Sequence, residues 1–168
     1  MKRFILLNVV GLGFLTLAVP AAHATLLFQA TLDGTQESSP NSSLGTGFGT
    51  VVLNDTADQI TVNLTWSGLT APATASHIHG PAAPGFNAAV VFPFSGVPAA
   101  TSGSIAEHVF AMPAARLADF KAGLYYFNVH TSNFPGGEIR GQIRQVPEPA
   151  TLSLLVLGGL TLLQRKRR

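Results

Sequence analysis

The chain contains no cysteine among its 168 residues. This absence excludes disulfides, thiol nucleophiles, iron–sulfur clusters and cysteine-ligated zinc. Several catalytic patterns are missing as well: no Ser-His-Asp order, phosphate-binding loop or paired-carboxylate motif stands out. The sequence also has no internal repeat. We therefore expect neither an enzyme of these classes nor a repeat architecture, and we expect packing or a metal to stabilise the fold.

Basic charge is scarce in the middle of the chain and concentrated at its ends. The whole-chain net charge of +2 and isoelectric point of about 9.4 would suggest an anionic partner. Residues 25–146, however, contain four basic and seven acidic residues, which gives a net charge of −3. This segment is therefore mildly acidic, and we expect no nucleic-acid partner.

The N-terminus has the pattern of a secretory signal peptide. Lys2 and Arg3 precede an apolar stretch from Phe4 to Val19, and Ala22-His23-Ala24 supplies small residues around a cleavage site. The pattern predicts a signal peptide over residues 1–24, with cleavage after Ala24. The alternative is an uncleaved N-terminal anchor.

The C-terminus combines a short rigid motif, an apolar run and a basic end. Pro147-Glu148-Pro149 precedes 14 apolar or small residues from Ala150 to Leu163, and the chain closes on Arg165-Lys166-Arg167-Arg168. Fourteen residues make a helix of about 21 Å, whereas a hydrocarbon core is about 30 Å thick. Such a helix spans a membrane poorly alone, and the cations would hold its end on the cytoplasmic side. Residues 147–168 are therefore predicted to be a sorting tail, the alternative being an ordinary C-terminal anchor.

This tail resembles the PEP-CTERM sorting signal of Gram-negative bacteria that secrete exopolysaccharide. The resemblance rests on residues 146–151, on Gly158-Gly159 within the apolar run and on the arginine-rich end. It implies membrane contact through the C-terminal helix, followed by recognition and cleavage by a membrane protease of the exosortase type. The expected location is beyond the inner membrane, in the cell envelope, at the outer surface or in the extracellular matrix.

Period-two alternation dominates the segment between these ends. Ile60, Val62, Leu64 and Trp66 alternate with polar residues and predict a half-buried strand. Further strands are expected over residues 28–32, 50–54, 124–130 and 138–145, a short helix over 113–123 and a mobile loop over 38–49. We predict one all-β domain over residues 25–146, an antiparallel sandwich or barrel of seven or eight strands with one short helix. Two hydrophobic targeting helices would flank it.

His77 and His79 are the most informative polar pair in this domain. Residues i and i+2 of a strand share a face, so both imidazoles project together. Two neutral imidazoles on one face form half of a typical copper or zinc site. Gly80-Pro81 ends the strand, and His130 lies beside another turn, where it could supply a third ligand. The alternative is that these histidines, like His108, only hydrogen-bond neighbouring loops.

Three stretches of the domain resemble the CHRD domain, a family named from chordin. They are residues 75–82 (ASHIHGPA), 126–131 (YFNVHT) and 134–143 (FPGGEIRGQI). The resemblance implies an immunoglobulin-like β-barrel with limited similarity to copper/zinc superoxide dismutases, and it implies no established activity.

The dismutase similarity implies copper ligands at His77, His79 and His130. Nothing matches the bridging histidine or the zinc ligands of those enzymes, so the implied site is mononuclear. Arg140 is expected to be a solvated strand residue that does not steer anions. A domain at −3 supplies little steering of an anionic substrate, which disfavours dismutase activity.

Two functional hypotheses follow. The first is an exported binding or structural module that contacts extracellular polysaccharide or matrix proteins and has no catalytic residues. The second is a mononuclear copper-binding or redox protein that uses His77, His79 and His130.

Overall fold

The computed structural model describes residues 25–147. The expected signal peptide, the apolar tail and the two targeting helices lie outside these residues. Within them, no helix is both long enough and apolar enough to cross a membrane.

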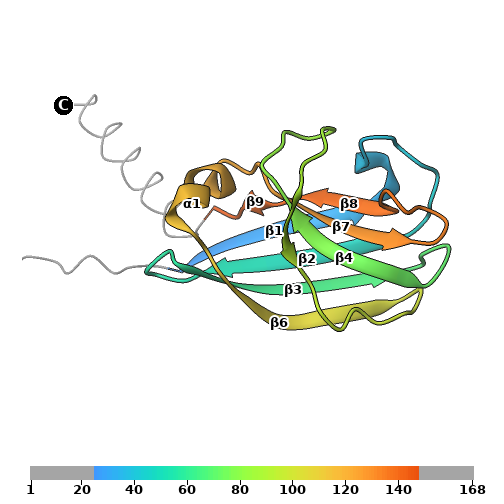
Figure 1. The fold of residues 1–168 in the computed structure, drawn as a ribbon, viewed down its shortest axis with the longest axis horizontal. Coiled ribbons are helices and arrows are strands. Elements are labelled where there is room, and N and C mark those ends of the chain that lie inside the picture. Colours follow the sequence, from blue (N-terminus) through green and yellow to red (C-terminus); the bar gives the residue numbers. More distant parts are fainter. Residues whose placement is uncertain (1–24, 148–168) are drawn as a thin grey trace, which may run out of the picture.

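Residues 25–147 form nine strands, one α-helix and one short 3-10 helix (Figure 1). The strands are β1 (Leu26–Asp33), β2 (Thr46–Leu53), β3 (Gln59–Ser67), β4 (Ala73–His79), β5 (Val90–Pro93), β6 (Gly103–Ala111), β7 (Tyr126–Thr131), β8 (Ile139–Gln142) and β9 (Arg144–Gln145). The helices are η1 (Gly34–Gln36) and α1 (Ala114–Lys121).

All strand pairs are antiparallel, and the sheet curls into a nearly closed barrel. The strand order is β5-β4-β7-β8-β1-β2-β3-β6, and β9 pairs with β1. The two end strands approach each other through their side chains, because Phe92 of β5 and the following Phe94 both contact Phe110 of β6. The predicted all-β antiparallel barrel with one short helix is confirmed.

Alternation along β3 shows why these residues form a barrel wall. Ile60, Val62 and Leu64 are fully buried, whereas the polar residues between them face the other side of the sheet. Burying a side chain of this size stabilises the fold by about 1.5–3 kcal/mol. The clearest strand expected from the sequence is thus a principal source of the core.

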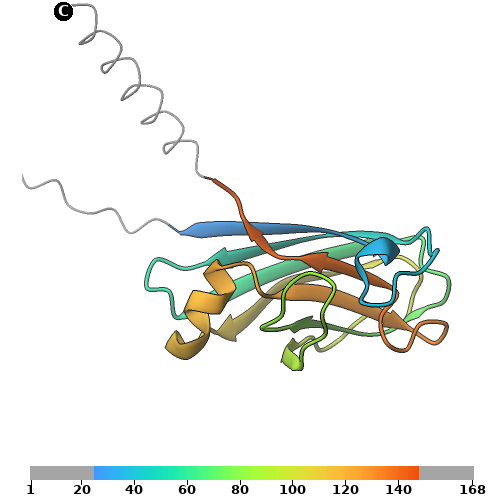
Figure 2. The same cartoon turned by 90° about the horizontal axis from the view of Figure 1, so that it is seen from above.

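The helix α1 covers one end of the barrel. Pro113 precedes it and sets the extended entry, and Gly123, with a φ of +75°, follows its end. Phe120 is fully buried and meets Phe28 of β1 edge-on, at 4.8 Å between ring centroids. Figure 2 shows α1 and η1 at opposite ends of the barrel.

Two sequence expectations were wrong at their boundaries. Thr46 to Gly49 belong to β2 and not to a loop. A Cβ on Gly49 would collide with the ring of Phe127, so glycine is there because of packing and not because the chain turns. The expected strand 138–145 is two strands, since the chain leaves β7 after Gln142 and pairs with β1 from Arg144.

The last strand fixes the end of the domain. Gln145 lies opposite Phe28, and the Val146 N–H donates to the Leu27 carbonyl at 2.8 Å. Ile143, between β8 and β9, is fully buried. The start of β1 and the end of β9 therefore lie side by side at the α1 end of the barrel.

A chain that ends at Val146 should be as stable as the complete chain, because it keeps every one of these contacts. A chain that ends at Gln142 should lose at least about 3 kcal/mol of unfolding free energy, since it loses the buried Ile143 side chain and the β1–β9 hydrogen bonds. Urea unfolding of the two chains checks this. Equal midpoints would contradict the domain boundary at residue 146.

Candidate metal centre

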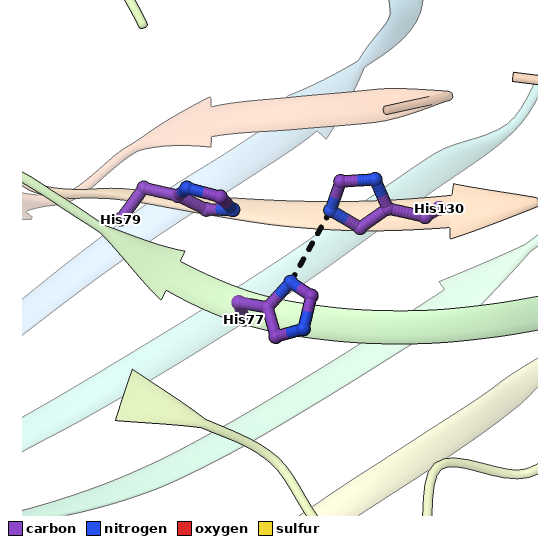
Figure 3. A group of neighbouring side chains, drawn as sticks. All are labelled: His77, His79 and His130. Atoms are coloured by element: carbon purple, nitrogen blue, oxygen red, sulfur yellow. Dashed lines mark hydrogen bonds between the residues drawn. The ribbon is translucent and has the colours of Figure 1, made fainter. Parts of the chain in front are cut away.

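Three histidines from two adjacent strands meet on the outside of the barrel (Figure 3). His77 and His79 come from β4, and His130 comes from β7. The register places His77 opposite Asn128, His79 opposite Tyr126 and His130 opposite Ala75, two residues before His77. The intervening Ile78 and Val129 are fully buried in the core. Alternation in two paired strands thus turns the apolar side chains inward and all three imidazoles outward.

The three rings are close enough to share one ion. One ring nitrogen from each histidine lies within 4.8 Å of the others. The shortest pair is His77 Nδ1 and His130 Nε2, at 3.3 Å. Ring centroids are 5.1 Å apart for His77 and His130 and 5.5 Å apart for His77 and His79. Among residues 25–147, this is the one group of three or more ligand-type side chains with such spacing.

Backbone carbonyls set the orientation of two of the rings. His79 Nδ1 lies 3.0 Å from the Ala88 carbonyl, and His130 Nδ1 lies 3.0 Å from the Pro135 carbonyl. A carbonyl only accepts, so each Nδ1 carries the proton and each Nε2 keeps its lone pair. This arrangement is typical of metal-ligating histidines. The Nε2 atom of His79 is buried and has no hydrogen-bond partner, so its lone pair is available to bind a metal ion.

The surroundings keep the rings neutral. Burial, followed by the proximity of His130 and then of His79, lowers the pKa of His77 to about 4. Burial also lowers the pKa of His79 and of His130, in each case against the opposing hydrogen bond to a carbonyl. Neutral imidazole is the form that binds a metal. The cluster therefore needs little proton release before it takes up a cation near neutral pH.

A stack of three side chains connects the cluster to β8. The His79 and Tyr126 rings are parallel within 6°, with centroids 5.0 Å apart, and the Arg140 guanidinium carbon lies 3.5 Å from the Tyr126 centroid. Arg140 is only 1% exposed, so its expected place as a solvated strand residue was wrong. Its Nη2 donates to the Phe86 carbonyl at 2.9 Å. Alternation along β8 correctly predicts that Arg140 lies on the outer side of the sheet. A loop covers that side here, so the side chain is buried.

The covering loop is residues 80–89, between β4 and β5. The sequence offers no ligand side chain here, and the structure uses its backbone instead. Ala88 accepts from His79 and donates its N–H to the Tyr126 hydroxyl at 3.1 Å. Gln142 of β8 donates to the Ala82 carbonyl at 3.0 Å. Sequence reasoning missed these backbone groups and the role of Tyr126. Alternation along β7 could have found Tyr126, because Tyr126, Asn128 and His130 share one face of that strand.

Glu138 holds together the loops at the η1 end of the barrel. It is fully buried and accepts hydrogen bonds from the hydroxyls of Ser43, Thr70 and Thr131 and from the Thr70 N–H, at 2.6 to 3.0 Å. Burial alone would raise the pKa of Glu138, but these hydrogen bonds outweigh it and lower the pKa. The Pro135 carbonyl that orients His130 lies in the turn just before Glu138. By fixing this turn, Glu138 indirectly fixes the orientation of the His130 ring.

The glycines around Glu138 have a packing role. Gly137, with a φ of +132°, lies where a Cβ would collide with Asn128 and Glu37. A Cβ on Gly141 would collide with the Thr31 carbonyl of β1. The stretch Gly136-Gly137-Glu138-Ile139-Arg140-Gly141 thus combines two close backbone approaches with a buried acid and a buried base.

His108 lies apart from the cluster. His108 is on β6, where its Nε2 lies 3.2 Å from the Ser95 hydroxyl and its ring packs beside Phe94. His108 therefore contacts the loop after β5 and takes no part in the histidine cluster. Pro147 is the last described residue, and Glu148 and Pro149 of the predicted motif lie outside the described part.

Comparison with known families agrees with both resemblances. Residues 28–143 match the family model of the CHRD domain, and residues 145–168 match that of the PEP-CTERM protein-sorting motif. The first match spans more than half of the chain, so the chain belongs to the CHRD domain family. No curated protein and no solved structure matches the chain.

The Glu138→Gln variant should lose about 2–4 kcal/mol of unfolding free energy at neutral pH, because an amide nitrogen would face hydroxyl and N–H donors. The lowered pKa of Glu138 means that its stabilisation is present above the unfolded-state value of 4.5 and is lost as the pH falls through the folded-state pKa. The variant should lack this component of acid sensitivity. Urea unfolding at neutral pH and near pH 4 measures both effects.

The exposed Glu107 provides the matched control. Glu107→Gln should change the unfolding free energy by less than about 0.5 kcal/mol. A Glu138→Gln loss no larger than this control would contradict the role of Glu138 as the centre of the loop network.

Proposed function

We propose that this CHRD-family protein binds one copper ion outside the cytoplasm through His77, His79 and His130. The CHRD domain and the sorting motif indicate a secreted protein that an exosortase, a membrane protein, processes for delivery to the cell envelope or outer surface. The observation that carries the copper proposal is the convergence of three ring nitrogens within 4.8 Å, one of them buried without a partner.

The donor set favours copper among the transition metals. Imidazole suits zinc and copper, and divalent copper binds nitrogen ligands more tightly than its first-row neighbours. Two cis nitrogens bound to one ion at about 2.0–2.1 Å lie about 2.9 Å apart in the square-planar arrangement that divalent copper prefers and about 3.3 Å apart in a tetrahedral one. His77 Nδ1 and His130 Nε2 are 3.3 Å apart, so this pair already suits a single ion. The third nitrogen lies within 4.8 Å of both, so it must approach by up to about 1.5 Å.

The same geometry supports a copper-holding or electron-transfer role over dismutation. The described residues offer one ligand cluster, which suits a mononuclear site and not a dinuclear one. Arg140, the one described arginine beside the cluster, is buried under loop 80–89 and stacked on Tyr126, so it is badly placed to attract an anion from solvent. The net charge of −3 over residues 25–146 adds no positive steering field.

A copper titration tests this proposal. The purified protein should bind one equivalent of Cu(II) with a dissociation constant below about 1 μM, and the EPR spectrum should report nitrogen ligands. The double variant His77→Ala/His79→Ala should bind at least about 100-fold more weakly, because it keeps one of three ligands. His108→Ala, which removes a histidine outside the cluster, should bind like the wild type.

Three outcomes would contradict the proposal. They are the absence of copper binding at micromolar concentrations, equal binding by the double variant, and tighter binding of Zn(II) than of Cu(II) in direct competition. The last outcome would reassign the centre to zinc.

We also propose that the processed domain stays at the cell surface and contacts extracellular polysaccharide or matrix proteins. The sorting motif supports this location. Deleting residues 147–168 should release a folded domain into the medium, since the β1–β9 pairing lies before the deletion. Fractionation of cells and medium measures this. A deleted chain that is retained as well as the complete chain would contradict sorting by the tail.

A further inference from the structure

Arg140 of β8 places a positive charge beside the histidine cluster. Asn128 of β7 lies opposite His77 of β4 on one side and opposite Arg140 on the other, so the three residues form one row across three strands. From this row the Arg140 guanidinium extends over the ring of Tyr126, which stacks on His79. A charged group is thus part of the support of one of the three imidazoles.

The position of this charge is fixed. The guanidinium donates to the Phe86 carbonyl at 2.9 Å, and the whole residue is only 1% exposed. A guanidinium keeps its proton in proteins even where burial lowers its pKa, as it does at Arg140. Salt screens a buried charge much less than an exposed one. The cluster therefore lies next to a permanent positive charge.

The charge is close enough to act on an ion held by the cluster. The Tyr126 centroid lies 3.5 Å from the guanidinium carbon and 5.0 Å from the His79 centroid. Unit charges about 10 Å apart, the separation that this stack implies, change an equilibrium about tenfold at an effective dielectric constant of about 20. The field of Arg140 reaches the ring, because burial lowers the pKa of His79 most and the charge of Arg140 adds to that lowering.

The effect of this charge differs between the two common oxidation states of copper. A positive charge repels Cu(II) with twice the energy with which it repels Cu(I). The three imidazoles are neutral and offer no compensating charge. No described carboxylate contributes to the lowered pKa of His77, His79 or His130. A fixed cation at this place therefore favours the singly charged ion.

Glu37 offsets part of the Arg140 charge. Its side chain is buried, and burial raises its pKa to about 7 against the lowering effects of Arg140 and of a hydrogen bond from Asn128. At pH 8 the carboxyl is therefore mostly ionised and weakens the field of the guanidinium. Removal of this carboxylate should act on the cluster in the opposite direction to removal of the guanidinium.

We propose that Arg140, held over Tyr126, is a positioning residue that shifts the metal preference of the histidine cluster from Cu(II) toward Cu(I). This inference rests on the copper binding proposed above. The stacked geometry, the burial of the guanidinium and the neutral ligand set carry it. Arg140 does not contact the ion, so its charge and not its shape is the property that matters.

Separate titrations with Cu(I) and Cu(II) at pH 8 test the inference. Competition with bicinchoninate under argon measures the Cu(I) affinity, and calorimetry measures the Cu(II) affinity. In Arg140→Gln the preference for Cu(I), taken as the ratio of the two dissociation constants, should fall about tenfold, which corresponds to about 59 mV in reduction potential. Cu(II) should bind more tightly to this variant than to the wild type, whereas damage to the site would weaken its binding.

Three further variants separate charge from shape. Arg140→Lys, which keeps the charge, should retain more of the Cu(I) preference than Arg140→Gln does. Glu37→Gln should increase the preference for Cu(I) at least about threefold, and it stays interpretable if the Arg140 variants fail to fold. Arg144→Gln makes the same change at an exposed arginine of β9 and should alter the ratio less than about twofold, because water and salt screen that charge. Thermal unfolding checks that each variant is folded.

Each remaining outcome overturns the inference. An unchanged ratio in a folded Arg140→Gln variant would remove the role of the charge, and an Arg140→Lys variant that behaves like Arg140→Gln would leave only a role in packing. A Glu37→Gln ratio that stays constant or moves toward Cu(II) would contradict the sign of the effect. Failure of the wild type to bind either ion would overturn the copper proposal itself, and the wild-type titration therefore tells the two failures apart.

Discussion

The pairing of β4 with β7 is the constraint on which the rest of the molecule depends. One register step places Ile78 and Val129 in the core and leaves His77, His79 and His130 on the opposite side. A slip of one residue would turn the imidazoles inward and expose the apolar side chains, with a cost of several kcal/mol from lost burial. The hydrophobic core therefore holds the histidines in place, although no histidine belongs to it. Any chemistry at this surface depends on the packing behind it.

The loops complete what the strands begin, and they do so mainly with backbone groups. Carbonyls from Ala88 and Pro135 fix two imidazoles, and the carbonyl of Phe86 holds the guanidinium of Arg140. Backbone acceptors of this kind are insensitive to the identity of the residue that carries them. The residues that supply these carbonyls can therefore vary while the geometry persists, whereas Gly80, where a Cβ would collide with Tyr125, and Gly85, with a φ of +83°, restrict the path of loop 80–89. Glu138 has the corresponding role at the other end, where one buried carboxylate collects donors from three segments.

Local pattern predicted the fold better than it predicted the site. Alternation in β3 and the proline and glycine around α1 gave the all-β class and the one helix, because those signals act within a few residues. The glycines of β2 led to a wrong prediction of a loop, because Gly49 is required by its close contact with the Phe127 ring of β7, which is distant in sequence. Arg140 was misplaced for a similar reason, because its exposure depends on loop 80–89 and η1. Period-two reasoning gives the side of the sheet, whereas what covers that side is a long-range property.

The strand β1 pairs with β2, which follows it closely in the chain, and with β9, which is the last strand to be made. Contacts between the two ends of a chain close a long loop and form late in folding. A polypeptide threaded outward from its N-terminus cannot complete the wall between β7 and β1 while β8 and β9 are still inside. The wall of the barrel is thus left open until export is complete, and the topology itself delays the locked state until the chain has reached the compartment where it works.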